Sequence, residues 1–164
     1  GGFSKFIAEA ATRLTALYDD RRLAGAFTRS DVLLVAYSGG YLPAAWSLAI
    51  GKANARVRGV VLLDAMYGEI DRFVDRVEAM RPPAFFISAY GNSSRDGNDA
   101  FKQELDEARL RYATMLPKTF AYGGTFVIDA GPDVRHQDFV TQAWTSDPLT
   151  WILARIPGYP QRAR

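Results

Sequence analysis

The segment VLLVAYSGGY, residues 32–41, is an apolar run that stops at Ser38 and two glycines. One interpretation is a tight turn alone, and the other is a turn that presents the Ser38 hydroxyl as a nucleophile. A serine is a poor nucleophile at neutral pH unless a base takes its proton and N–H donors stabilise the oxyanion that forms. The base in turn needs an acceptor on its other ring nitrogen. The second interpretation therefore requires a histidine and a carboxylate elsewhere in the chain.

Candidates for these partners are few. The chain has one histidine, so imidazole chemistry within it depends on His136. Carboxylates follow the apolar runs that lie between Ser38 and His136: Asp64 ends VVLLD, and Asp96 lies in the polar loop GNSSRDGND. The absence of cysteine excludes thiolate chemistry and cysteine zinc sites, and a single histidine excludes multi-histidine metal clusters. No G-x-G-x-x-G or Walker-type motif is found. We therefore expect no metal site and no cofactor.

Apolar strands that alternate with amphipathic helices must position these residues. Continuous apolar runs predict buried strands, and apolar residues three and four positions apart predict helices. This alternation indicates an α/β fold with a mostly parallel sheet of at least four strands and helices on both faces. The predicted strands are 32–36, 60–64, 84–89 and 125–128; the predicted helices are 3–19, 42–50, 70–77, 99–115 with Asp99 as N-cap, and helical sequence to about 156 whose last helix starts at Asp147-Pro148.

Parallel sheets of this kind bind ligands at the carboxyl ends of their strands. Ser38, Asp64, the 91–99 loop and His136 each follow a predicted strand. We therefore expect these side chains at one common edge of the sheet.

The segment Ala36-Tyr37-Ser38-Gly39-Gly40 resembles the nucleophile elbow of the α/β-hydrolases, G-x-S-x-G, with alanine in place of the first glycine. The chain order of serine, acid and histidine also fits that family. The resemblance implies a serine hydrolase that cleaves an ester, or an amide, of a small molecule through an acyl-enzyme. It makes Ser38 the nucleophile, His136 the general base and the Gly39 backbone N–H an oxyanion donor. The tight turn is expected to require small residues at positions 39 and 40.

The acid has two candidates. The family usually places it after the strand before the last, here the loop with Asp96, whereas some members place it one strand earlier, here at Asp64. Asp64 is preferred because a charge at the end of a buried strand is costly without a partner. Tyr37 and Tyr41 flank the nucleophile and are candidates for substrate binding, with packing as the alternative.

The resemblance begins at the nucleophile elbow, so residues 1–164 are interpreted as a single, partial hydrolase-like domain. Four strands without those that normally precede the elbow would leave an open edge beside the strand that leads to Ser38. We expect an upstream segment or a companion chain to complete the sheet. The alternative function is a non-catalytic hydrolase-like domain that binds a ligand or a partner.

Charge and hydropathy bear on whether the chain binds nucleic acid or spans a membrane. Lys and Arg number 20 against 18 Asp and Glu, and the arginines are scattered among acidic residues. Nucleic-acid-binding proteins usually cluster them on one face, so we expect no nucleic-acid binding. No apolar stretch approaches the roughly 20 residues that span a bilayer. With no signal peptide visible in this segment, the sequence predicts a soluble chain without a membrane span.

Overall fold

The computed structural model describes residues 2–19, 21–52 and 54–159, and a four-stranded, all-parallel sheet lies at its centre. The strands pair in the order β1-β2-β3-β4, the same order as in the chain. They comprise β1 (Val32–Tyr37), β2 (Val57–Leu63), β3 (Phe85–Tyr90) and β4 (Gly124–Asp129). Because all four strands run in one direction, their carboxyl ends lie along the same end of the sheet. The predicted parallel α/β fold is confirmed.

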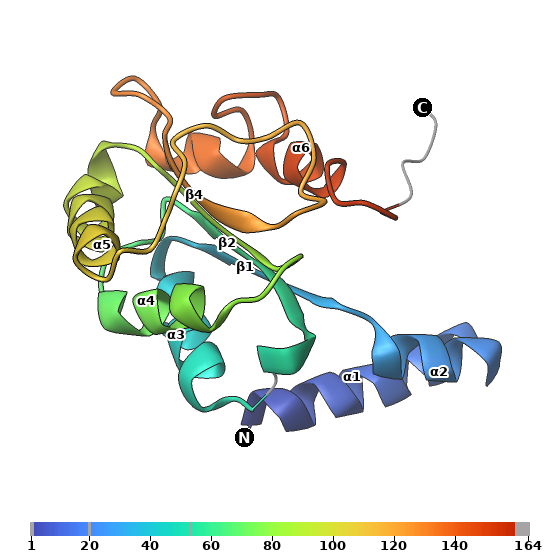
Figure 1. Cartoon of the computed structure of the whole chain (residues 1–164). Coiled ribbons are helices and arrows are strands. Elements are labelled where there is room, and N and C mark those ends of the chain that lie inside the picture. Colours follow the sequence, from blue (N-terminus) through green and yellow to red (C-terminus); the bar gives the residue numbers. More distant parts are fainter. Residues whose placement is uncertain (1, 20, 53, 160–164) are drawn as a thin grey trace.

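Helical elements cover both faces of the sheet (Figure 1). On one face lie α3 (Tyr41–Ile50), α4 (Ile70–Ala79) and α5 (Arg95–Glu107); on the other lie the 3₁₀ helix η4 (His136–Val140) and α6 (Pro148–Leu153). The sheet separates two hydrophobic cores, one on each face. Within β2, Val60 and Leu62 pack in the core on the face of α3, α4 and α5, whereas Val61 and Leu63 pack in the core on the other face. Burial on both sides explains why the strands read as unbroken apolar runs.

The first strand forms an edge of the sheet. No strand within residues 2–19, 21–52 and 54–159 pairs with its outer side. Val35 of β1 is 41% exposed, whereas every residue of β3 is buried. The open edge predicted beside the strand that leads to Ser38 is thus present in the described part of the chain.

Two helices precede the sheet and lie to one side of it (Figure 1). They are α1 (Gly2–Tyr18) and α2 (Arg21–Arg29), which contact each other. The predicted apolar face of α1 is largely uncovered, because Ala11 is its buried residue while Phe6 and Leu17 are 64% and 76% exposed. The sequence pattern does not predict α2.

Several predicted helix ends are wrong. The helix expected over 99–115 is α5, which starts at Arg95 and ends at Glu107. Asp99 is therefore not an N-cap; it lies inside α5 and forms an ion pair of 2.6 Å with Lys102. The helix ends early because Arg109 adopts a left-handed backbone with φ of 57°, and the N–H groups of Arg109 and Leu110 close the turn on the carbonyl oxygens of Asp106 and Leu105. The extended chain that follows brings Ala113 into a bridge with Phe126 of β4.

The late helical stretch consists of two short elements, separated by turns and bends. The first, η4, ends at Val140, and α6 begins at Pro148 as predicted. The Asp147 side chain caps α6 by accepting a hydrogen bond from the Thr150 N–H at 3.0 Å. None of the helices in the described segments is long and apolar enough to cross a membrane.

Candidate active site

Ser38 lies where β1 turns into helix. It is the first residue after the strand, and it opens the 3₁₀ helix η1 (Ser38–Gly40) that leads into α3. Its φ of 55° is in the left-handed region, which is uncommon and strained for a residue with a side chain. A strained strand-to-helix turn is the local geometry that exposes a nucleophilic serine at the end of a sheet.

Asp64 occupies the matching position on the neighbouring strand. Tyr37 and Leu63, the last residues of β1 and β2, pair with each other, so Ser38 and Asp64 follow directly from paired positions. Asp64 also has a left-handed backbone, with φ of 45°. Two adjacent strands therefore end in a polar residue with the same unusual backbone conformation.

The Asp64 carboxylate is fully buried and surrounded by donors. It accepts hydrogen bonds from the Ser93 hydroxyl, the Ser94 hydroxyl at 2.5 Å, the Gly91 N–H at 3.2 Å and Nδ1 of His136 at 2.6 Å. Burial by itself would raise the pKa of Asp64, but these hydrogen bonds outweigh it and hold the pKa below its ordinary value. The carboxylate is therefore ionised at neutral pH.

His136 begins η4, in the segment that follows β4, and its side chain is 34% exposed. An ionised carboxylate can only accept hydrogen bonds, so the contact with Asp64 places a hydrogen on Nδ1. In the neutral ring, Nε2 is then the basic nitrogen. Nε2 has no hydrogen-bond partner in the described part of the chain. The imidazole thus has the orientation that a general base needs.

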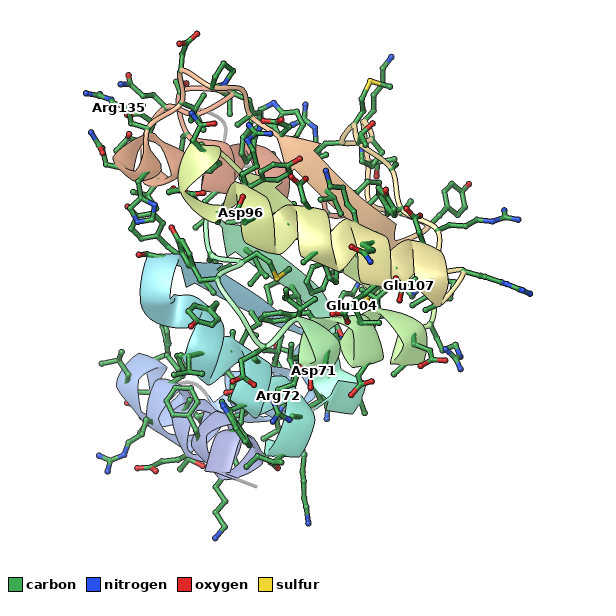
Figure 2. All side chains as sticks on the ribbon, turned by 90° about the vertical axis from the view of Figure 1, so that its left-hand side faces the viewer. Asp71, Arg72, Asp96, Glu104, Glu107 and Arg135 are labelled. Carbon is green, nitrogen blue, oxygen red and sulfur yellow. The ribbon has the colours of Figure 1, made fainter. Side chains whose placement is uncertain are left out.

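Of the two acids predicted for His136, the structure brings Asp64 to the imidazole. Asp96 is exposed in the first turn of α5, as Figure 2 shows, and no hydrogen bond joins it to His136 among residues 2–19, 21–52 and 54–159. Its separation from the histidine follows from where α5 starts. The helix begins at Arg95 and directs this side chain into solvent.

Aromatic side chains surround the imidazole. The ring of Tyr37 stacks on His136 with 4.7 Å between centroids, and the Tyr67 hydroxyl lies 3.5 Å from Nδ1. Tyr41 contacts Tyr67, with centroids 5.9 Å apart. Both predicted tyrosines therefore lie in or beside the site. Burial, followed by the nearby charge of Asp64, raises the pKa of the Tyr67 phenol despite the opposing Ser93 hydrogen bond.

Three residues of the site are not singled out from the sequence: Tyr67, Ser93 and Ser94, although the two serines lie in the 91–99 loop that is expected near Ser38. Tyr67 lies in the segment DAMYGE just after β2, and the two serines lie in the polar segment GNSSRDGND just after β3. Their position after a strand is the one sequence feature that indicates a place in the site, because segments that follow parallel strands lie at the same end of the sheet as Ser38. Serines are common loop residues, so their type alone carries little information.

The expected steric need for glycine at positions 39 and 40 is not found. A Cβ added to Gly39, which is exposed, would meet no heavy atom within 4 Å. A Cβ on Gly40 would lie 3.5 Å from the Cβ of Ala36, an ordinary van der Waals contact. Neither glycine has a positive φ. The described neighbours thus leave open space beside the backbone of Gly39.

One contact of a complete triad is missing. No hydrogen bond joins the Ser38 hydroxyl to His136 in the described part of the chain. The structure therefore shows a histidine–carboxylate pair at the same sheet edge as Ser38, without a direct bond to the serine.

Comparison of the chain with protein-family models, with curated proteins and with solved structures finds no match in any of the three. Within the described segments, no group of three or more His, Cys, Asp or Glu residues is arranged to hold a metal ion.

Proposed function

We propose that the chain carries the active site of a serine hydrolase of the α/β-hydrolase type, which cleaves an ester or amide bond through an acyl-enzyme on Ser38. The observation that supports this most is the 2.6 Å hydrogen bond between His136 and the buried Asp64. It orients a basic nitrogen at the same edge of the sheet as a serine on a strained turn.

In this mechanism the Ser38 hydroxyl oxygen attacks the carbonyl carbon of the substrate, and Nε2 of His136 accepts its proton. The carbonyl oxygen becomes an oxyanion, which the N–H of Gly39 stabilises. When the tetrahedral intermediate collapses, the leaving alcohol or amine takes the proton from Nε2, and the acyl group stays on Ser38. Water then attacks the acyl-enzyme with His136 again as base, releasing the acid and restoring Ser38.

Asp64 contributes through charge and orientation. Because its pKa is held low, it is negative throughout the neutral range and stabilises the imidazolium formed in each step. Ser93, Ser94 and the Gly91 N–H hold the carboxylate in place before substrate arrives. The carboxylate and its donors therefore do not need to reorganise during the reaction.

The mechanism needs the Ser38 oxygen within hydrogen-bond reach of Nε2. Such bonds are often long without substrate and shorten in the substrate complex. Nε2 has no competing partner in the described chain, and the Ser38 hydroxyl has none either. Neither group would have to break another hydrogen bond to form this one.

The surroundings favour an apolar substrate group. Tyr37, Tyr41 and Tyr67 place aromatic surface beside the imidazole, and the space next to Gly39 is open. We propose a small-molecule ester with an apolar acyl or alcohol group as the substrate class.

The test uses a fluorophosphonate probe, which reacts with an activated serine, together with hydrolysis of a p-nitrophenyl ester. We expect labelling and turnover in the unmodified protein, loss of both in Ser38→Ala, and retention of both in Ser146→Ala. Ser146 is an exposed serine and serves as the matched control. Absence of labelling and turnover in the folded, unmodified protein would contradict the proposal.

A second candidate is a non-catalytic hydrolase-like domain that binds a ligand or a partner. The missing hydrogen bond between Ser38 and His136 favours it, as does the open edge of β1, which an upstream segment or companion chain could pair with. The buried carboxylate behind His136 argues against it, because a binding domain has no need of this costly arrangement. Unlabelled Ser38 in a sheet completed by a further strand would favour this candidate.

A further inference from the structure

A cavity of about 340 Å³ lies at the opposite end of the sheet from Ser38. It is formed by the start of β2, the end of α4 and the segment that precedes β3. Because β2 has seven residues, this cavity is roughly 20 Å from the candidate active site. Four arginines line it, Arg56, Arg58, Arg76 and Arg81, together with one carboxylate, Asp31.

Arg76 is the most deeply buried of these arginines, with 6% of its surface exposed. Its Nη2 donates a hydrogen bond of 2.6 Å to the carbonyl oxygen of Val57, while its Nε is buried without a partner. No carboxylate within the described segments forms an ion pair with it. Burial accordingly lowers the pKa of Arg76. A buried guanidinium with an unpaired N–H is costly unless an anion completes its contacts.

Arg58 also presents an unpaired donor. Its Nη1 contacts Asp31 at 3.2 Å, but its Nε is buried without a partner. The pairing of β1 with β2 skips this residue: Val32 pairs with Val57, and the next pair joins Leu33 to Gly59. An irregularity of this kind turns a side chain away from regular pairing, often beside a functional site.

Within residues 2–19, 21–52 and 54–159, neither of the other two arginines forms an ion pair with a carboxylate. Arg56 donates to the carbonyl oxygens of Phe27 and Ser30, and Arg81 donates to those of Glu78 and Met80. The lining therefore has four positive charges against the single negative charge of Asp31, whose side chain is 61% exposed.

We propose that this cavity binds a small molecule through an oxyanion group, phosphoryl or carboxylate, held by Arg58 and Arg76. An oxyanion accepts the charged N–H donors that guanidinium groups offer, often two at once. The volume is at the lower end of the range for small-molecule sites, which excludes a large ligand. This site uses none of the residues of the proposed hydrolase site.

The test is isothermal titration of the whole chain with pyrophosphate and, separately, with citrate at constant ionic strength. We expect saturable binding at one site, with the tighter anion showing whether phosphoryl or carboxylate groups are preferred. Arg58→Gln and Arg76→Met should each weaken the binding at least tenfold. Arg13→Gln is the matched control, because Arg13 is exposed on α1 and pairs with Glu9, and it should bind as the unmodified protein does.

Thermal melting in the presence of the anion gives a second measurement, because a ligand that binds the folded state raises the melting temperature. If Arg76→Met does not fold, Arg58→Gln decides the outcome. Absence of saturable binding of both anions would overturn the proposal, and so would equal weakening by Arg13→Gln and Arg58→Gln. Binding is read directly, so the result is independent of any hydrolase activity.

Discussion

The imidazole of His136 stacks on the phenol ring of Tyr37, with 4.7 Å between centroids and 23° between the planes. Tyr37 is the last residue of β1, which is one outer strand of the sheet, whereas His136 follows β4, which is the other outer strand. The segment after β4 therefore crosses the carboxyl ends of the strands to reach the residue next to Ser38. Asp64 holds one edge of the imidazole, and Tyr37 holds one of its faces.

Replacing Tyr37 by alanine should loosen His136. A ring stacked at this distance shifts the NMR resonances of its neighbour, and the single histidine makes the His136 C–H signals unambiguous. We expect these signals to move in Tyr37→Ala and to stay close to their original positions in Tyr37→Phe, which keeps the ring. The turnover of a p-nitrophenyl ester should fall about tenfold in Tyr37→Ala, which is of the order of 1.4 kcal/mol. Identical spectra for Tyr37→Ala and the unmodified protein would contradict the stacked arrangement.

Replacing Asp64 by asparagine should nearly abolish catalysis. The amide no longer enforces a hydrogen on Nδ1 and no longer stabilises the imidazolium, and a comparable change in serine proteases lowers kcat about 10⁴-fold. Asp96→Asn is the matched control, since Asp96 is exposed and apart from His136, and its kcat should be unchanged. Loss of activity in Asp96→Asn, with activity kept in Asp64→Asn, would transfer the acid role to Asp96.

The low pKa of Asp64 predicts acid destabilisation. Its pKa is below the ordinary value in the folded state, so the unfolded chain takes up the proton first as pH falls. The stabilisation is complete above the ordinary carboxyl pKa and is lost as pH falls through the lower, folded value. Ser94→Ala removes one donor to the carboxylate and should cost about 1–3 kcal/mol at pH 7.

The difference between Ser94→Ala and the unmodified protein should be constant above the ordinary carboxyl pKa and should shrink as pH falls from that value through the lower, folded pKa of Asp64. Urea unfolding at a series of pH values measures it, and other carboxylates with lowered pKa cancel because they are common to both proteins. A difference that is constant over this range would show that the Ser94 bond does not depend on the charge of Asp64.

The backbone of Ser38 predicts an unusual stability order. Its φ of 55° is accessible to glycine without strain but costly for a residue with a Cβ. Ser38→Gly should therefore be more stable than Ser38→Ala by about 1 kcal/mol in urea unfolding. Both should lose fluorophosphonate labelling. A more stable Ser38→Ala would argue against the left-handed turn.

The open edge of β1 predicts uneven hydrogen exchange. β2 has a neighbouring strand on both sides, whereas β1 has one only on the β2 side in the described chain. We expect the amides of β1 to exchange faster on average than those of β2 when the chain is alone. A strand that completes the sheet should slow them, whereas equal protection without one would show that the edge is already covered.

The four strands and the chain order of the candidate residues can be predicted from the amino-acid sequence. A parallel sheet that is buried on both faces requires strands of continuous apolar residues, so β1 to β4 can be recognised as apolar runs in the sequence. The residues that interrupt these runs, Ser38 and Asp64, follow necessarily at the carboxyl ends of their strands. The predicted helix ends are less accurate, because α5 ends in a left-handed turn at Arg109, and arginine is not a residue type that indicates this conformation.

Which of these side chains contact one another depends on the packing of the folded chain. Asp64 and Asp96 both follow predicted strands, but only Asp64 reaches His136, which lies 72 positions further along the chain. Ser93 and Ser94 contact Asp64 because β3 lies beside β2, and Arg58 and Arg76 line one cavity because α4 packs near the start of β2. Periodicity records which face of an element is buried, whereas contacts across the sheet depend on register and on where each helix starts.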